Sequence, residues 1–236
     1  MSNLGIIAAL PAEGRLLCRQ FSPGKIQPLP DQQSLLVCGI GARAAARAAC
    51  TLIEAGADHL LSWGCAAGLR AATRPGDLFL PRRILTDAGA RQLPVDPEWH
   101  THLATCLQAH GIAFDDAALI GVEKLLTDPT GKQELAQQTD AAVADMESAA
   151  IADVAREHAL PFLCIRAVAD NYTMTVPAAL TSVLNDYGQA DLRQLTALLL
   201  RQPQLLPQLL QLGRAFSRAR RSLANVRACD ITLGLR

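Results

Sequence analysis

A strand–helix–strand pattern near the middle of the chain, from residue 140 to residue 171, constrains the fold more than any other feature of the sequence. It consists of a short apolar run, an amphipathic helix, and a β-branched apolar run over residues 162–168 that begins after Pro161. A crossover of this kind joins parallel strands of one sheet. We therefore predict an α/β fold in which Glu147 and Asp170 lie just past the carboxyl ends of two parallel strands, where ligands bind in such sheets.

A third acidic residue has a similar position near the amino terminus. Residues 4–10 form an apolar run that predicts a central strand, and Pro11 then suits the first turn of a helix that contains Glu13. A single carboxylate at a helix start or in a turn often has only a structural role. Because all three acids follow predicted strands, we interpret them as one site.

Two segments rich in small residues follow two other predicted strands. Residues 39–44, with the sequence GIGARA, have the glycine spacing of a dinucleotide-binding loop, but no acid ends the next strand over residues 59–63. An NAD-dependent oxidoreductase is therefore only a distant alternative. Residues 64–68 are predicted to form a loop whose backbone N–H groups line a pocket.

The composition sets limits on partners and compartment. Of 236 residues, 50% are hydrophobic and 19% are charged, so we expect apolar surface to be covered in a homodimer or by lipid. The net charge of zero argues against a nucleic-acid-binding protein that relies on phosphate contacts. Scattered cysteines in apolar runs, and no signal peptide before the first strand, predict a cytoplasmic protein.

No metal site is expected from the spacing of potential ligands. His100 and His102 lie close together, but no cysteine or acid stands at a supporting distance in the sequence. We expect this pair at the solvent-facing start of a helix.

The C-terminal part of the chain carries two leucine stripes, over residues 192–199 and 205–216, and a group of arginines that ends at Arg221. An apolar face beside arginines suits a helix packed on its own domain, with the arginines near the C-terminal end of the helix dipole. It also suits a helix that lies peripherally on the inner face of a membrane.

Five segments, in this order, resemble the nucleoside phosphorylase superfamily, especially its methylthioadenosine/S-adenosylhomocysteine nucleosidase branch. They span roughly residues 4–200 and are GIIAALPAE, CGIGARAAARAA, SWGCAAGL with PGDLFLP, VADMESAAIADV and FLCIRAVADN. The resemblance implies a single α/β domain over residues 1–200, with a central mixed, twisted sheet flanked by helices. A helical extension over residues 201–236 is most similar to the hopanoid-associated members, which remove adenine from adenosylhopane.

The resemblance also implies roles for the matched residues. Glu13 would activate the attacking water, Asp170 would be the acid that faces purine N7, and Glu147 would bind the ribose hydroxyls. The other residues expected to contact the substrate are Cys65, Ala66, Leu125, Leu126, Asp145 and Met146. The implied enzyme takes a small-molecule purine nucleoside, which can be lipid-linked, and needs no cofactor. Phosphate would be a co-substrate if the enzyme is phosphorolytic.

Three matched positions depart from the family pattern. Cys65 and Ala169 stand where relatives have serine, which weakens one hydroxyl contact and removes another. Leu125 replaces an aromatic residue that stacks on the purine, which leaves a looser apolar wall.

The three acids suit the cleavage of a ribosyl C–N bond. A buried carboxylic acid can protonate the departing purine, and a carboxylate on the ribose hydroxyls binds more strongly as the sugar becomes oxocarbenium-like. An acid at position 13 would repel phosphate, so we favour water as the nucleophile, although Arg15, Arg43 and Arg70 could still supply phosphate donors. A phosphorolytic enzyme and a methylthioadenosine/S-adenosylhomocysteine nucleosidase are the alternatives.

Overall fold

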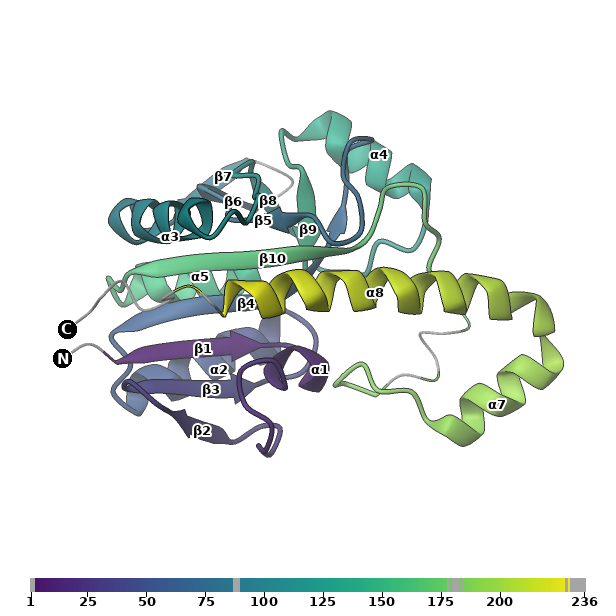
Figure 1. Cartoon of the computed structure of the whole chain (residues 1–236), viewed down its shortest axis with the longest axis horizontal. Coiled ribbons are helices and arrows are strands. Elements are labelled where there is room, and N and C mark those ends of the chain that lie inside the picture. Colours follow the sequence, from purple (N-terminus) through teal and green to yellow (C-terminus); the bar gives the residue numbers. More distant parts are fainter. Residues whose placement is uncertain are drawn as a thin grey trace.

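The computed structural model describes residues 3–86, 90–177, 179, 183, 185–227 and 229. Within these residues, ten strands form one mixed sheet with helices on both faces, which confirms the predicted fold class (Figure 1). The strands are β1 Leu4–Ala8, β2 Ile26–Leu29, β3 Gln33–Val37, β4 His59–Gly68, β5 Leu78–Phe79, β6 Arg83–Thr86, β7 Arg91–Pro94, β8 Leu119–Gly121, β9 Val143–Asp145 and β10 Phe162–Asp170. The helices are α1 Pro11–Gly14, α2 Ala42–Glu54, α3 Pro97–Ala109, α4 Pro129–Gln138, α5 Ser148–Glu157, α7 Leu192–Arg201, the 3-10 helix η2 Pro203–Leu205 and α8 Leu206–Val226.

β4 is the strand on which the two halves of the sheet meet. β1 runs parallel to its first residues, with Ile7 opposite Ser62, and β10 runs parallel along its other edge from Leu60 to Ala67. β9 pairs in antiparallel fashion with the last two residues of β4, on the edge that β1 has left. The backbone of β4 between these two partners therefore faces a gap in the sheet.

The prediction that Glu147 and Asp170 follow two parallel strands is wrong. β9 is antiparallel to β4 whereas β10 is parallel to it, so the strands before these two acids run in opposite directions. An apolar run in the sequence indicates a buried strand but contains no information on the direction of its neighbour. β9 instead runs parallel to β8, in the second half of the sheet.

Two local predictions also need correction. Residues 64–68 do not form a loop, because β4 continues through them to Gly68 and pairs there with β10 and β9. His100 does not face solvent: it is buried within α3, and its Nε2 lies 2.8 Å from the Leu80 carbonyl oxygen. In both cases tertiary neighbours cover a segment that looks like a surface segment in the sequence.

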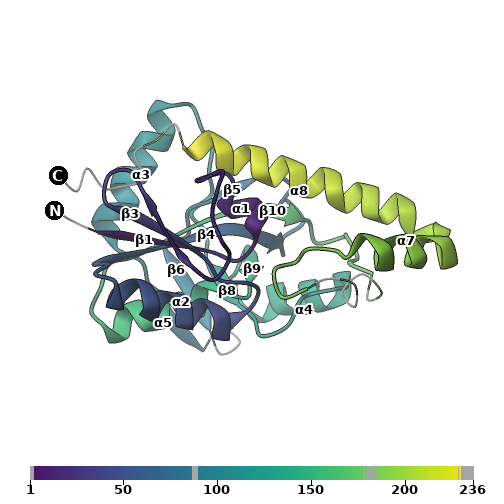
Figure 2. The same ribbon diagram turned by 90° about the horizontal axis from the view of Figure 1, so that it is seen from below.

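The helices cover the sheet unequally. Figure 2 shows α2 and α5 on one face and α8 on the other. The C-terminal half of α8 packs on the sheet through residues three or four positions apart, which are buried: Ala215, Ala219, Leu223 and Val226. Its first half and α7 project past the carboxyl ends of β1 and β10 (Figure 1). Residues 228 and 230–236 of the predicted extension lie outside the described residues.

Replacing Gly121 by alanine should lower the free energy of unfolding by about 1–3 kcal/mol, because the new Cβ would overlap the Ala149 Cβ where α5 crosses β8. Ala149→Gly in the same chain should restore most of this loss, as measured by urea unfolding. Gly213→Ala is the control: this glycine lies within α8 and its Cβ position is open, so the change should be neutral or stabilising. Equal destabilisation by both alanines would contradict the tight contact.

Candidate active site

Arg166 is the charged centre of the candidate site. Its side chain extends from β10 and the residue is only 2% exposed. Nε donates to Asp145 Oδ2 at 2.5 Å, and one terminal nitrogen donates to Ser62 Oγ at 2.8 Å and Ser148 Oγ at 3.0 Å. Burial opposes the cation, but neighbouring acids outweigh it and raise the pKa of Arg166 above its ordinary value. The guanidinium is therefore held in place by several partners at once.

Arg166 is not among the site residues predicted from the sequence. The signal that could have found it is a single charged residue inside the apolar run 162–168. A charge in a buried strand needs a partner, so such a residue predicts an ion pair within the core.

Asp145 is the main partner of Arg166 and also organises the start of α5. Its Oδ1 accepts hydrogen bonds from the backbone N–H of Ser148 at 3.1 Å and of Glu147 at 3.4 Å. Its Oδ2 accepts from Arg166 and from the Ser148 hydroxyl. Both oxygens thus have partners inside the chain, which gives Asp145 a clear positioning role, and its predicted contact with substrate stays a prediction.

Glu147 is held over the glycine-containing loop that precedes α2. Its Oε1 accepts a hydrogen bond of 2.8 Å from the backbone N–H of Gly41. Gly41 has φ of 102°, a conformation that favours glycine, and this turns its N–H toward the carboxylate. The N–H that a dinucleotide phosphate would use is therefore bound to Glu147. Burial first, and then the charge of Asp145, raise the pKa of Glu147 to about 7.

Glu13 is buried at the edge of β4 that β1 leaves open. Its Oε1 accepts from the backbone N–H of Cys65 at 2.8 Å, and its Oε2 accepts from the backbone N–H of Leu10 at 2.9 Å. Burial raises the pKa of Glu13, whereas Arg166 and the two backbone donors lower it. The net increase in proton affinity suits a group that takes a proton from water, although the bond to Leu10 is also a helix-capping contact.

Asp170 forms an ion pair with Lys132 of α4, a residue that is not among those predicted from the sequence. The Lys132 side chain is 0% exposed, and its ammonium group also donates to the carbonyl oxygens of Asn171 at 3.0 Å and Met174 at 3.2 Å. Burial raises the pKa of Asp170, and Lys132 lowers it. A lysine in a polar helix gives no signal in the sequence, because only the folded chain decides that it is buried.

The remaining predicted residues have different environments. Cys65 is half-buried, and burial followed by the charge of Glu13 raises the pKa of its thiol well above the ordinary value. The Ala66 side chain packs in the core. Leu125 is 47% exposed in the loop after β8, and Leu126 packs against a small cluster around β8 and β9. Met146 lines a cavity.

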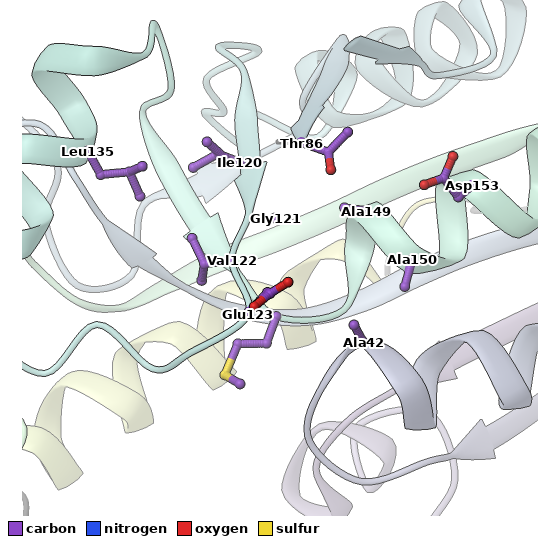
Figure 3. A pocket seen from close by; sticks show the side chains of 11 residues that line it. Ala42, Thr86, Ile120, Gly121, Val122, Glu123, Leu135, Ala149, Ala150 and Asp153 are labelled. Carbon is purple, nitrogen blue, oxygen red and sulfur yellow. The ribbon is translucent and has the colours of Figure 1, made fainter. Parts of the chain in front are cut away.

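This cavity has a volume of about 430 Å³ and lies between the start of α2, the end of β8, α4 and α5 (Figure 3). Its remaining lining residues are Ala42, Thr86, Ile120, Gly121, Val122, Glu123, Leu135, Ala149, Ala150 and Asp153. Met146 links it to the acids, because it stands between Asp145 and Glu147 in the chain.

The structure thus brings Glu13, Asp145 and Glu147 together around Arg166. Asp170 lies at the end of β10, opposite Ala67 of β4, in a separate pair with Lys132. That all these carboxyls face one nucleoside-sized hollow stays a prediction.

A family model for the phosphorylase superfamily matches residues 4–201. The chain belongs to this superfamily. The match includes every residue of the Arg166 cluster and the Asp170–Lys132 pair, and it ends at the last residue of α7. No protein with a curated function matches the sequence.

Solved structures resemble this superfamily member over nearly its whole length. The methylthioadenosine/S-adenosylhomocysteine nucleosidase from Neisseria meningitidis, in complex with methylthio-immucillin-A, is 19% identical with a TM-score of 0.71, over 97% of each chain. The futalosine hydrolase of Helicobacter pylori is 14% identical with a TM-score of 0.68, over 96% of this chain and 97% of that chain. At these identities the likeness shows the fold alone.

The raised pKa of Glu147 should make stability depend on pH. Its pKa is about 7 in the folded protein against an ordinary 4.5, so between these values the folded chain holds a proton that the unfolded chain releases. The free energy of unfolding should therefore fall as pH rises through this window, by roughly 3 kcal/mol. Glu147→Gln should remove this fall and be more stable than the parent at alkaline pH.

The measurement is urea unfolding at a series of pH values. Glu54→Gln, at an exposed position of α2, is the matched control and should leave the slope unchanged. A Glu147→Gln variant with the parent's slope would show that Glu147 is not the group responsible.

Proposed function

We propose that the protein hydrolyses the N-glycosidic bond of a 5′-substituted purine nucleoside and releases adenine. The observation that carries the proposal is the cluster in which buried Glu13 and Glu147 flank Arg166 of β10, with a third, half-buried acid, Asp170, at the end of the same strand. Buried carboxyls with raised pKa values are the groups that acid–base cleavage of a ribosyl bond requires.

In the proposed reaction, Glu13 takes a proton from water as the water oxygen bonds to C1′ of the ribose. The C1′–N9 bond breaks, its electron pair stays with the purine, and Asp170 delivers a proton to N7. Glu147 binds the ribose hydroxyls, an interaction that strengthens as positive charge develops on the sugar. The products are adenine and the free 5′-substituted ribose, and each proton has a named donor and acceptor.

The existing hydrogen bonds and ion pairs of Arg166 and Arg70 support water rather than phosphate as the nucleophile. The Nε and one terminal nitrogen of Arg166 are already bound by Asp145 and two serine hydroxyls. Arg70, one of the arginines considered as a phosphate donor, pairs with Asp140. The acid at position 13 would also repel a phosphate dianion. Phosphorolysis is therefore the second candidate.

Lys132 would act through Asp170 as a positioning residue. Its ammonium charge lowers the pKa of the Asp170 carboxyl, which burial raises, and it stabilises the carboxylate left after proton delivery. Its bonds to the Asn171 and Met174 carbonyl oxygens also fix the segment after β10.

The proposal is tested by incubating the full chain with 5′-methylthioadenosine and following adenine release with and without phosphate. Release without phosphate is expected. Glu13→Gln and Asp170→Asn should each lower kcat by about 10²–10⁴-fold with the fold intact. No adenine under either condition would defeat the proposal for this nucleoside class, and strict phosphate dependence would establish phosphorolysis instead.

Matched controls keep this test specific. Glu54→Gln and Asp31→Asn change exposed acids of the same types and should leave kcat unchanged.

Lys132→Met should shift the limb of the kcat–pH profile that Asp170 governs to higher pH, because the lysine no longer favours the carboxylate. Lys124→Met, at an exposed position, is the control and should not shift it. An unshifted profile for Lys132→Met would remove Lys132 from the mechanism.

The leucine hairpin, defined as residues 192–214, supports a more specific substrate. Leu200 is 80% exposed, Leu206 48% and Leu210 51%, and the hairpin projects beyond the strand ends that carry the acids (Figure 1). The segment before it is tied to the loop that holds Glu147, since the Ile40 N–H donates to the Asp186 carbonyl oxygen at 2.8 Å. We propose that the 5′ substituent is apolar, with adenosylhopane as the candidate, and that the hairpin touches a membrane surface.

Among the described residues, no helix is both long and apolar enough to cross a bilayer. Peripheral contact through the leucine hairpin and a homodimer that covers further apolar surface both stay predictions.

Replacing Leu200, Leu206 and Leu210 together by glutamate should lower binding of the full chain to liposomes more than tenfold in a flotation assay. Each buried leucine contributes about 1.5–3 kcal/mol, and about 1.4 kcal/mol corresponds to a tenfold change. The control replaces the exposed Gln204, Gln208 and Gln211 by glutamate, which adds the same charge to the same hairpin. Equal loss in both variants would indicate charge repulsion rather than apolar contact.

A further inference from the structure

Two cysteines and a histidine meet at the end of the molecule opposite the leucine hairpin. Cys106 and His110 lie one helical turn apart at the C-terminal end of α3, and Cys229 follows the end of α8. One potential ligand atom from each residue lies within 4.8 Å of the others. Figure 1 places α3 and the end of α8 on the side of the molecule away from α7, so this Cys2His cluster is remote from the acids.

The distances within the cluster match those of a tetrahedral metal site. The Sγ atoms of Cys106 and Cys229 each lie 3.7 Å from His110 Nδ1. With Zn–S bonds of about 2.3 Å and Zn–N bonds of about 2.0–2.1 Å, tetrahedral angles place sulfur and nitrogen about 3.5–3.6 Å apart. A zinc ion therefore fits between the three atoms with small side-chain movements.

We propose that the Cys2His cluster binds Zn²⁺ with three protein ligands and a water molecule. Thiolate and imidazole ligands favour zinc over harder cations such as Mg²⁺ or Ca²⁺. Cys229 is buried, Cys106 is half-buried and His110 is exposed, so the ion has both a protected side and an open side. His110 also lines a cavity of about 610 Å³, which provides room for the water.

Zinc binding changes the protonation and hydrogen bonding of the cluster in a defined way. His110 Nδ1 lies 2.9 Å from the Cys106 carbonyl oxygen, so in the metal-free state its N–H donates there, and a bound metal ion would replace this hydrogen bond. A thiol binds zinc as the thiolate, so the ion must displace the protons of the cysteine ligands. Binding therefore releases protons and tightens as pH rises.

Zinc binding would cross-link two parts of the chain that are distant in the sequence. The ion would join the end of α3 to the segment after α8, since His110 and Cys229 are 119 positions apart in the chain. This holds the C-terminal half of α8 on the sheet without touching the Arg166 cluster. Zinc should accordingly raise thermal stability and leave the rate of adenine release unchanged.

The test uses the full chain after treatment with a chelator and a reductant, titrated with Zn²⁺ under reducing conditions. We expect one ion per chain, protection of two of the seven cysteines from a thiol reagent, and an increase in Tm. Co²⁺ in place of Zn²⁺ should give a thiolate charge-transfer band and the spectrum of a tetrahedral site. These measurements on the parent chain do not depend on the folding of any variant.

Variants then assign the ligands. Cys106→Ser and Cys229→Ser should each abolish the cobalt spectrum, and His110→Ala should weaken Zn²⁺ binding at least tenfold. Cys18→Ser, at another half-buried free cysteine, is the matched control and should change nothing. Three results would overturn the proposal: no stoichiometric zinc, a cobalt spectrum without thiolate bands, or a Cys106–Cys229 disulfide on oxidation in a chain that binds no metal when reduced.

Discussion

The ion pair between Arg166 and Asp145 is the interaction on which the centre of this structure depends. Both side chains are 2% exposed, and together with Glu13 and Glu147 they place one guanidinium among three carboxyls in the core. Removing either partner would leave a buried charge without its main counter-ion. This would lower the free energy of unfolding by far more than a surface ion pair contributes to it. The pair also fixes Ser148 and the start of α5, so the same contact stabilises the fold and positions the site.

The path of β4 explains why the acids meet at this point. β1 leaves one edge of β4 before β9 reaches it, and the Cys65 N–H in the resulting gap needs an acceptor. Glu13 supplies it from α1, directly after β1. A buried backbone N–H needs an acceptor. Because the gap leaves the Cys65 N–H without a partner from a neighbouring strand, a carboxylate takes that place in the core.

Asp170 and Lys132 form a second ion pair, in which the lysine is buried and the carboxyl half-buried, and it acts on a different part of the chain. Lys132 connects α4 to the end of β10 and to the segment that follows it. In the proposed reaction the two groups have different tasks: the Arg166 cluster acts on the nucleophile and the sugar, and the Asp170–Lys132 pair acts on the departing base. Each carboxyl has a proton affinity set by burial and by its own cationic neighbour.

The sequence by itself determined the fold class, several strands, and the placement of Glu13, Glu147 and Asp170 near strand ends, because apolar periodicity and turn residues are local signals. Only the tertiary structure decided that β9 and β10 run in opposite directions, that residues 64–68 extend β4, and that Arg166 and Lys132 are buried partners of the acids. Strand direction and ion pairing join residues far apart in the chain. Cys229 and His110, 119 positions apart in the chain, are a further example, since only the packing of α8 on the sheet brings them together.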